Sequence, residues 1–163
     1  KVFCYTLMFS KRKESIRIFA FSLAFLLFLG LFNKILFAET ADHVIKKRVA
    51  KFKEASENLK FLRHAIRQSN YEDAKKLLKF HEEWSMMIPD SFPLGSEASV
   101  NNKSDASYEI WNYFEKFVFY SSDYHDRVLK LKSALDSGQK SNVSKAFGAM
   151  AKSCKSCHSM FRN

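Results

Sequence analysis

The apolar residues of this chain recur at steps of three and four, and this period constrains its fold more than any other feature. Between positions 42 and 66 they form one stripe, made of Ile45, Val49, Phe52, Ala55, Leu59, Leu62 and Ile66. Such spacing places side chains on one face of an α-helix. The 163 residues contain 4 glycines and 2 prolines, too few for the frequent turns of a sandwich or barrel. The sequence therefore predicts an all-α protein.

The first half of the chain predicts two helices and a long loop. Asp42 is the expected N-cap of the first helix, and Asn70 is the expected N-cap of the second. The second helix should stop before Pro89, because proline disfavours the helical conformation at the residue that precedes it. From Pro89 to about Asp105 the sequence is irregular, and a loop of this length in a compact domain is often functional.

Two further helices are predicted after the loop. The third carries an apolar stripe from Ile110 to Leu135 and ends at Gly138, since glycine is the usual C-terminal stop of a helix. Ser141 or Asn142 is expected to cap a last helix that runs to about Arg162. Four amphipathic helices with mostly short connections predict an antiparallel four-helix bundle.

The N-terminal 38 residues have the pattern of a secretory signal peptide. Basic residues at positions 11–13 and 17 precede an apolar run over 18–32, which is shorter than the roughly 20 residues of a transmembrane span. We expect Met8 to be the natural start and cleavage to follow Ala38, which leaves 39–163 as a periplasmic domain. Leu36 is large for its place before the cleavage site, so an uncleaved anchor is the alternative.

The charge of the predicted mature domain is modest. Removal of the signal takes away six basic residues and one acidic residue, so the net charge falls from +10 to about +5. The remaining charges are dispersed and form no basic tract. This pattern is typical of a solvated surface and argues against a nucleic-acid partner.

The segment Cys154-Lys155-Ser156-Cys157-His158 is the C-x-x-C-H pattern of c-type haem attachment. The two thiols add to the vinyl groups at one porphyrin edge, and the next imidazole can then reach the iron. On a helix Cys154, Cys157, His158 and Phe161 share one face. A disulfide, or half of a zinc site, is the alternative. A zinc site would need further cysteines or histidines at matching spacing, and a thioredoxin-like pair would need a βαβ pattern.

The chain resembles the cytochrome c prime family of bacterial four-helix cytochromes over roughly Val44 to Arg162. The similar segments are Val44-Ile45-Lys46-Lys47-Arg48, Phe92-Pro93-Leu94-Gly95-Ser96, Glu109-Ile110-Trp111, Ala146-Phe147-Gly148, the haem motif and Phe161-Arg162. The resemblance implies one covalent haem c with His158 as its axial ligand. It also implies that Arg48 lies beside a haem propionate, that the loop with Phe92 adjoins the haem, and that Arg162 lies beside the proximal imidazole.

In this family the residue four positions after the first-helix arginine divides electron carriers, which have methionine there, from gas binders. Here that residue is Phe52, which has no donor atom. The resemblance therefore implies five-coordinate, high-spin iron that binds nitric oxide or carbon monoxide and can transfer electrons to a protein partner. The pocket is expected to be too apolar to stabilise bound oxygen. The alternative is a six-coordinate electron carrier, with Met86, Met87 or His81 as candidate ligands.

Two further expectations complete the sequence-based picture. Relatives commonly pair through their first two helices, so a homodimer is expected. The sequence contains no acid–base pair or activated nucleophile, and we therefore expect a binding and electron-transfer protein, not an enzyme.

Overall fold

The computed structural model describes residues 41–98, 102 and 104–163. The predicted signal segment, 1–38, lies outside these residues. Within them the chain is all-α, and its only β feature is one isolated bridge between Ala106 and Arg162. No helix in the described part of the chain is both long and apolar enough to cross a bilayer.

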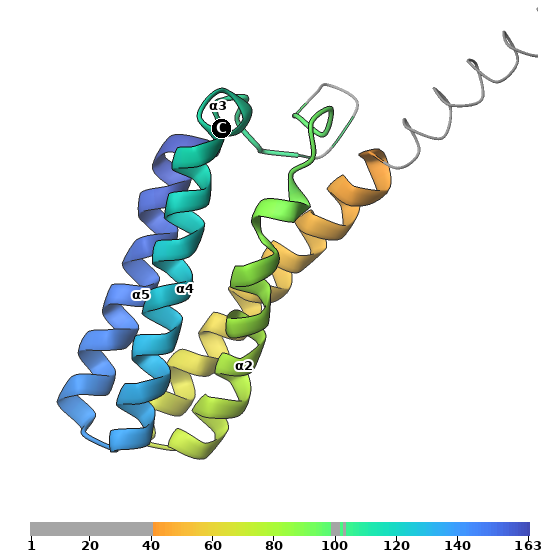
Figure 1. Cartoon of the computed structure of the whole chain (residues 1–163). Coiled ribbons are helices and arrows are strands. Elements are labelled where there is room, and N and C mark those ends of the chain that lie inside the picture. Colours follow the sequence, from red (N-terminus) through yellow and green to blue (C-terminus); the bar gives the residue numbers. More distant parts are fainter. Residues whose placement is uncertain (1–40, 99–101, 103) are drawn as a thin grey trace, which may run out of the picture. The chain divides into compact units, whose positions relative to one another are not determined.

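The first two helices form a hairpin (Figure 1, orange to green). The described part of the first helix covers 41–67, and α2 follows over Tyr71–Met87. As predicted, Asn70 caps α2, because its side chain accepts a hydrogen bond from the backbone N–H of Asp73. The predicted cap at Asp42 is wrong: residue 41 is already helical, and Asp42 instead pairs with Lys46 at 2.7 Å.

The second half of the chain forms another hairpin. A short 3-10 turn, Pro89–Ser91, and the loop lead to α3, Glu109–Asn112, then α4, Phe114–Ser137, and α5, Lys140–Phe161. The predicted third helix is thus broken at Tyr113, whose backbone leaves the helical region (φ −129°, ψ 48°). Gly138 ends α4 in the left-handed conformation, as predicted. The last helix begins before Ser141, with Gln139 at its cap position.

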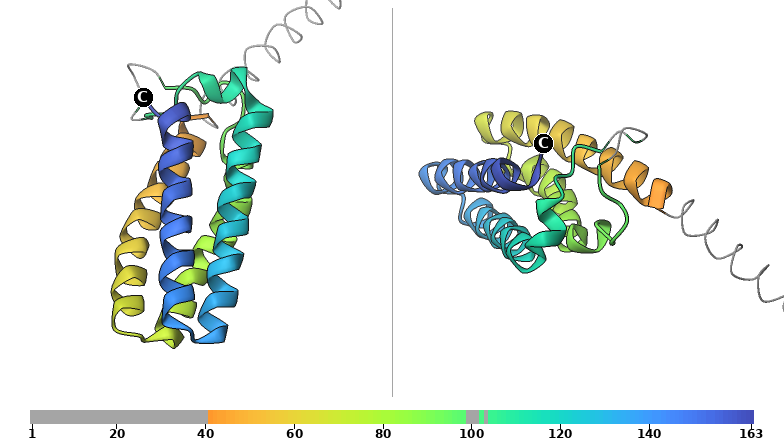
Figure 2. Two further views of the ribbon diagram at one scale, coloured as in Figure 1. Left: turned by 90° about the vertical axis from the view of Figure 1, so that its left-hand side faces the viewer. Right: turned by 90° about the horizontal axis from the view of Figure 1, so that it is seen from above.

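The two hairpins pack as an antiparallel four-helix bundle (Figures 1 and 2). α4 lies against both α2 and α5. The buried interior is apolar and includes Leu62, Ala74, Leu78, Val128, Leu131, Leu135, Val143 and Met150. The loop, α3 and the C-terminus gather at one end of the bundle (Figure 1). This end also holds the C-x-x-C-H motif, because the motif lies in the last turns of α5.

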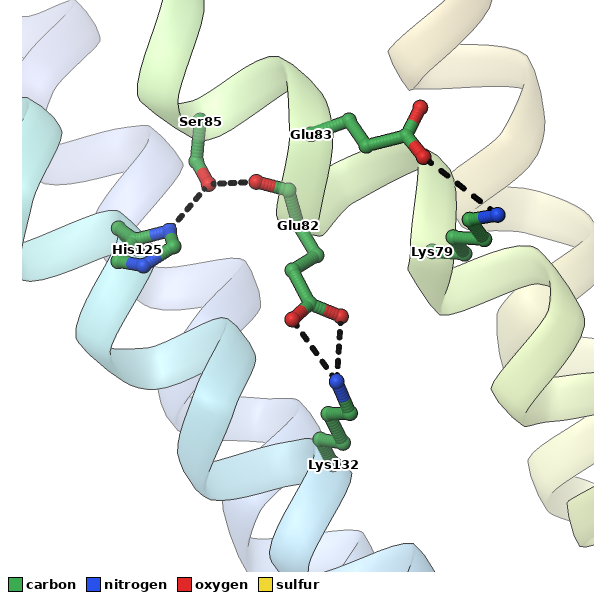
Figure 3. A network of polar contacts seen from close by, with 6 residues as sticks. All are labelled: Lys79, Glu82, Glu83, Ser85, His125 and Lys132. Atoms are coloured by element: carbon green, nitrogen blue, oxygen red, sulfur yellow. Dashed lines mark hydrogen bonds and ion pairs between the residues drawn. The ribbon is translucent and has the colours of Figure 1, made fainter.

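A polar network joins α2 to α4 (Figure 3). Lys132 Nζ lies 2.8 Å from both carboxylate oxygens of Glu82. The buried Ser85 hydroxyl donates to the Glu82 carbonyl at 2.9 Å, so the His125 Nδ1–H, 2.8 Å away, must donate to Ser85 Oγ. In this tautomer His125 does not accept the serine proton. The serine–histidine contact is therefore structural, and it is not an activated nucleophile.

A buried histidine–tyrosine pair lies between the same two helices. His81 is 2% exposed, and its Nδ1 lies 2.6 Å from the Tyr124 hydroxyl. Burial lowers the pKa of His81 to about 4 and raises the pKa of Tyr124. His81 is therefore neutral at pH 7. Its Nδ1 accepts a hydrogen bond from the Tyr124 hydroxyl, because no other acceptor for that hydroxyl is found among the described residues.

We expect His81 to make the protein less stable in mild acid. Unfolded histidine titrates near pH ~6.5, so between pH 6.5 and 4 the unfolded chain binds a proton that the folded chain does not. The free energy of unfolding should fall by about 3 kcal/mol over this window. Urea unfolding of the haem-loaded protein at pH 7 and pH 4.5 measures this loss. Between these two pH values His81→Gln should lose less stability than the unmodified protein. The control His64→Gln, at an exposed site, should lose as much as the unmodified protein. Equal losses in the two variants would contradict the role of His81 in the acid sensitivity.

Candidate functional site

The last turns of α5 carry Cys154, Cys157 and His158 on one helix face. Both cysteines are half-buried and unbonded to one another, and His158 is exposed. This part of the helix is regular, since its backbone continues to Phe161, which is buried in the core. The structure therefore presents two thiols and an imidazole at i, i+3 and i+4, the arrangement that the motif predicts.

The protonation of the two cysteines argues against a redox-active thiol pair. Burial raises the pKa of Cys154, and burial together with Cys154 raises the pKa of Cys157 to about 11. Redox-active Cys-x-x-Cys pairs have lowered pKa values instead. Among residues 41–98, 102 and 104–163, no group of three or more histidine, cysteine or acidic side chains could hold a metal ion. This finding gives no support to a zinc site.

The imidazole of His158 is suited to metal coordination. Partial burial, and then the positive charge of Arg162, lower its pKa. The ring is therefore neutral at pH 7, and a neutral imidazole has a nitrogen lone pair available to a metal.

Phe52 lies opposite His158. The first helix places its ring 6.4 Å from the imidazole, centroid to centroid, with 67° between the ring planes. Trp84 from α2 packs edge-on against Phe52 at 5.1 Å, and Phe92 from the loop lies 6.2 Å from it. The structure thus brings the predicted Phe52, Phe92 and His158 together and adds Trp84, which the sequence analysis did not assign to the site.

The methionines proposed as alternative ligands point elsewhere. Met86 and Met87 are 59% and 48% exposed, and neither belongs to the aromatic group around Phe52. His81, the third candidate, has one ring nitrogen bound to Tyr124, and its ring neighbours are Phe80 and Tyr124. None of the three lies against His158 in the way that Phe52 does.

Arg48 is a buried cation held by neutral groups. It is 2% exposed, and its guanidinium donates to Ser96 Oγ at 2.7 Å, to Ser104 Oγ at 2.8 Å and to the Ser96 carbonyl. The guanidinium also lies 4.4 Å over the ring of Phe92. Burial lowers the pKa of Arg48 to about 10, with Glu97 opposing the shift. Because no carboxylate forms an ion pair with Arg48 in the described residues, the position suits an added anionic group.

We expect Arg48→Met to release the loop from the bundle. The change removes hydrogen bonds to Ser96, to Ser104 and to the Ser91 carbonyl, and it leaves the buried Ser96 groups without their donor. The free energy of unfolding should fall by about 2–4 kcal/mol, measured by urea unfolding. Lys46→Met is the matched control, because its ion pair with Asp42 is exposed and should contribute less than about 1 kcal/mol. An Arg48→Met variant as stable as the control would show that the loop is held by other contacts.

Arg162 is tied to the loop and not to the core. α5 ends at Phe161, and the Arg162 guanidinium forms a 2.8 Å ion pair with Asp105. The backbone reinforces this contact, since Ser107 N–H donates to the Phe161 carbonyl and Asn163 N–H donates to the Asp105 carbonyl. The positive charge of Arg162 nevertheless lowers the pKa of His158. Sequence reasoning missed the Asp105 pairing, and it also missed Ser96 and Ser104 as partners of Arg48, because no local pattern indicates such long-range contacts.

An all-α bundle with a C-x-x-C-H face in its last helix defines the class of helical-bundle c-type haem proteins. Comparison with known families gives the particular family. The family model described as cytochrome c' matches residues 43–162. The chain therefore belongs to the cytochrome c' family, whose members carry a single covalently attached c-type haem.

Individual relatives agree with this assignment. Cytochrome c' of Rhodospirillum rubrum is 33% identical over 75 residues, which is 46% of this chain and 50% of that protein. The chain spans about half the length of the curated relatives it matches.

Solved structures show the same fold. Cytochrome c' of Alcaligenes xylosoxidans, solved as a nitric oxide complex of one variant and with carbon monoxide bound to another, is 22% identical to this chain. Its TM-score is 0.67, and the match covers 76% of this chain and 95–96% of that one. A third cytochrome c', with ligand-controlled dimer dissociation, is 17% identical with a TM-score of 0.69 over 75% of this chain and 95% of that one.

The residues of the site fit a haem. The two thiols and the neutral imidazole match the attachment chemistry, and the buried Arg48 offers a positive group to an anionic propionate. The rings of Phe52, Trp84, Phe92 and Phe117 provide an apolar surface for a porphyrin. No observation at the site argues against the group.

Proposed function

We propose that this chain is a mono-haem cytochrome that binds a small diatomic gas at five-coordinate iron, in addition to accepting and giving electrons. The observation that carries the proposal is the ring of Phe52, which faces His158 and has no atom able to bind a metal. The nitric oxide and carbon monoxide complexes of the Alcaligenes xylosoxidans relative support the same reading.

The haem, when bound, supplies an iron with one-electron redox chemistry and an open coordination position. Cys154 and Cys157 would hold the haem through thioether bonds, and His158 would donate a nitrogen ligand to its iron. Arg48 would neutralise a propionate by charge-assisted hydrogen bonds, which are stronger than hydrogen bonds between neutral groups. Phe52 and Phe92 exclude water from the side opposite His158. In this arrangement the protein binds and orients the haem and its ligand.

A visible absorption spectrum of the reduced protein tests this proposal. We expect a high-spin spectrum, and a shift to a new Soret band when carbon monoxide is added. A low-spin spectrum that carbon monoxide does not change would mean that a side chain occupies the sixth position. The electron-carrier function would then replace the one proposed here.

The proposed location is the periplasm, reached by means of the N-terminal 38 residues. The pattern of basic and then apolar residues supports this, and c-type haem is attached outside the cytoplasm. Intact-mass measurement of periplasmic material should give a chain that begins near Glu39. Recovery of the chain only from membranes, with the apolar segment still attached, would favour an anchor.

A homodimer is the proposed assembly, on the basis of the relative whose dimer dissociation is controlled by its ligand. Light scattering at micromolar concentration should give twice the chain mass. A monomer mass would remove this part of the proposal.

A further inference from the structure

In the part of the chain that the structure describes, the indole N–H of Trp84 is a buried donor without an acceptor. The side chain is 3% exposed, and Nε1 has no hydrogen-bond partner among the described residues. Buried polar atoms in native proteins are almost always paired, either with protein groups or with ordered water. An unpaired donor inside a binding region therefore indicates where a ligand with an acceptor atom would be stabilised.

The chain's second tryptophan provides a direct comparison. Trp111 also lies beside the aromatic cluster, 6.2 Å from Phe92, but its Nε1–H donates to the Phe92 carbonyl at 3.1 Å. The fold can therefore supply an acceptor to an indole at this end of the bundle. Among the residues that the structure describes, it supplies an acceptor to Trp111 and none to Trp84.

The position of Trp84 relates its donor to the gas site. Its ring packs against Phe52 at 5.1 Å with the planes nearly perpendicular, and Phe52 in turn faces His158 at 6.4 Å. One turn earlier on α2, His81 has an unpaired Nε2 as well, but its ring lies against Phe80 and Tyr124 and makes no ring contact with Phe52. Of the two unpaired ring nitrogens of α2, only that of Trp84 belongs to a ring packed against Phe52.

We propose that the Trp84 indole N–H donates a hydrogen bond to the small ligand bound on the Phe52 side of the haem. This inference rests on the proposed gas-binding function and assigns its specificity. Hydrogen-bond donors in a haem pocket favour bound ligands whose outer atom carries more negative charge. The sequence predicts an apolar pocket, and the Trp84 N–H adds one hydrogen-bond donor to it. The donor favours nitric oxide over carbon monoxide, because the outer atom of bound nitric oxide carries more negative charge.

Trp84→Phe in the haem-loaded protein tests the inference, because it removes the N–H and keeps an aromatic ring. The infrared stretch of bound carbon monoxide should move to higher wavenumber, since a donor near the ligand lowers it. Nitric oxide should dissociate about 3- to 10-fold faster, the effect of one neutral hydrogen bond, and carbon monoxide should be affected less. Trp111→Phe is the matched control and should leave both measurements unchanged.

A second measurement needs no variant at the site. In the ferrous carbon monoxide form, full exchange into D2O converts the indole N–H of Trp84 to N–D, and this exchange should shift the infrared stretch of the bound carbon monoxide. A carbon monoxide stretch unchanged by Trp84→Phe, or one unchanged by the exchange, would overturn the inference while leaving gas binding intact. Failure of the unmodified protein to bind carbon monoxide would instead overturn the proposed function.

Discussion

Replacing Cys154 and Cys157 together with alanine should make the haem removable. In the unmodified protein, acid–acetone extraction should leave the colour with the polypeptide, because thioether bonds survive denaturation. The double variant should release its haem into the solvent phase. A variant with Lys155→Ala and Ser156→Ala is the matched control, since it alters the two residues between the cysteines and keeps both thiols. Haem that leaves the unmodified protein would contradict thioether attachment.

The same double variant should also make stability depend on haem concentration. A ligand that binds only the folded state stabilises it by an amount that grows with the free ligand concentration. At a haem concentration 100 times its dissociation constant the gain is about 2.7 kcal/mol. Added haem should therefore raise the free energy of unfolding of the alanine variant and leave that of the control unchanged. Equal responses in the two proteins would mean that the cysteines do not hold the cofactor.

The helices of this chain are predictable from local patterns, and their exact limits are less so. Asn70 and Gly138 act through their own side chain or backbone freedom, so the sequence identifies both boundaries. The break at Tyr113 has no such signal, because tyrosine neither favours the left-handed conformation nor lacks an N–H. The break separates α3 from α4, at the end of the bundle where the loop and the C-terminus also lie (Figure 1). Tertiary packing, not local preference, is the physical cause we assign to this break.

In the candidate site, too, local features were predictable from the sequence and long-range contacts were not. The attachment motif is contiguous, so its spacing alone predicts a shared helix face, and the structure places Cys154, Cys157 and His158 on it. Arg48 could be predicted as important only through the family resemblance. Its partners Ser96 and Ser104 lie 48 and 56 positions away in the chain. Contacts between residues so far apart depend on how the loop folds back over the bundle.

Replacing Phe52 should change the chemistry of the iron more than any other single substitution outside the haem motif. The ring occupies the space opposite His158, so it excludes water and crowds an incoming ligand. Phe52→Ala should open this space and speed carbon monoxide binding, by a factor of about ten for each ~1.4 kcal/mol removed from the barrier. Stopped-flow mixing of the reduced protein with carbon monoxide measures the rate. The packing with Trp84 and Phe92 would also be lost, at a cost of about 3–5 kcal/mol if the site does not collapse.

Phe52→Met should have the opposite effect on ligand access. A thioether on the same turn of the first helix can reach the iron, so the reduced spectrum should move toward low spin and carbon monoxide binding should slow. Phe92→Met is the matched control: it adds a thioether to the same aromatic cluster, but Phe92 does not face His158 among the ring contacts described. If Phe52→Met stays high-spin and binds carbon monoxide as the unmodified protein does, Phe52 does not cover the open coordination position. If both methionine variants become low-spin, a side chain at either position can reach the iron. Access to the open coordination position is then not specific to Phe52.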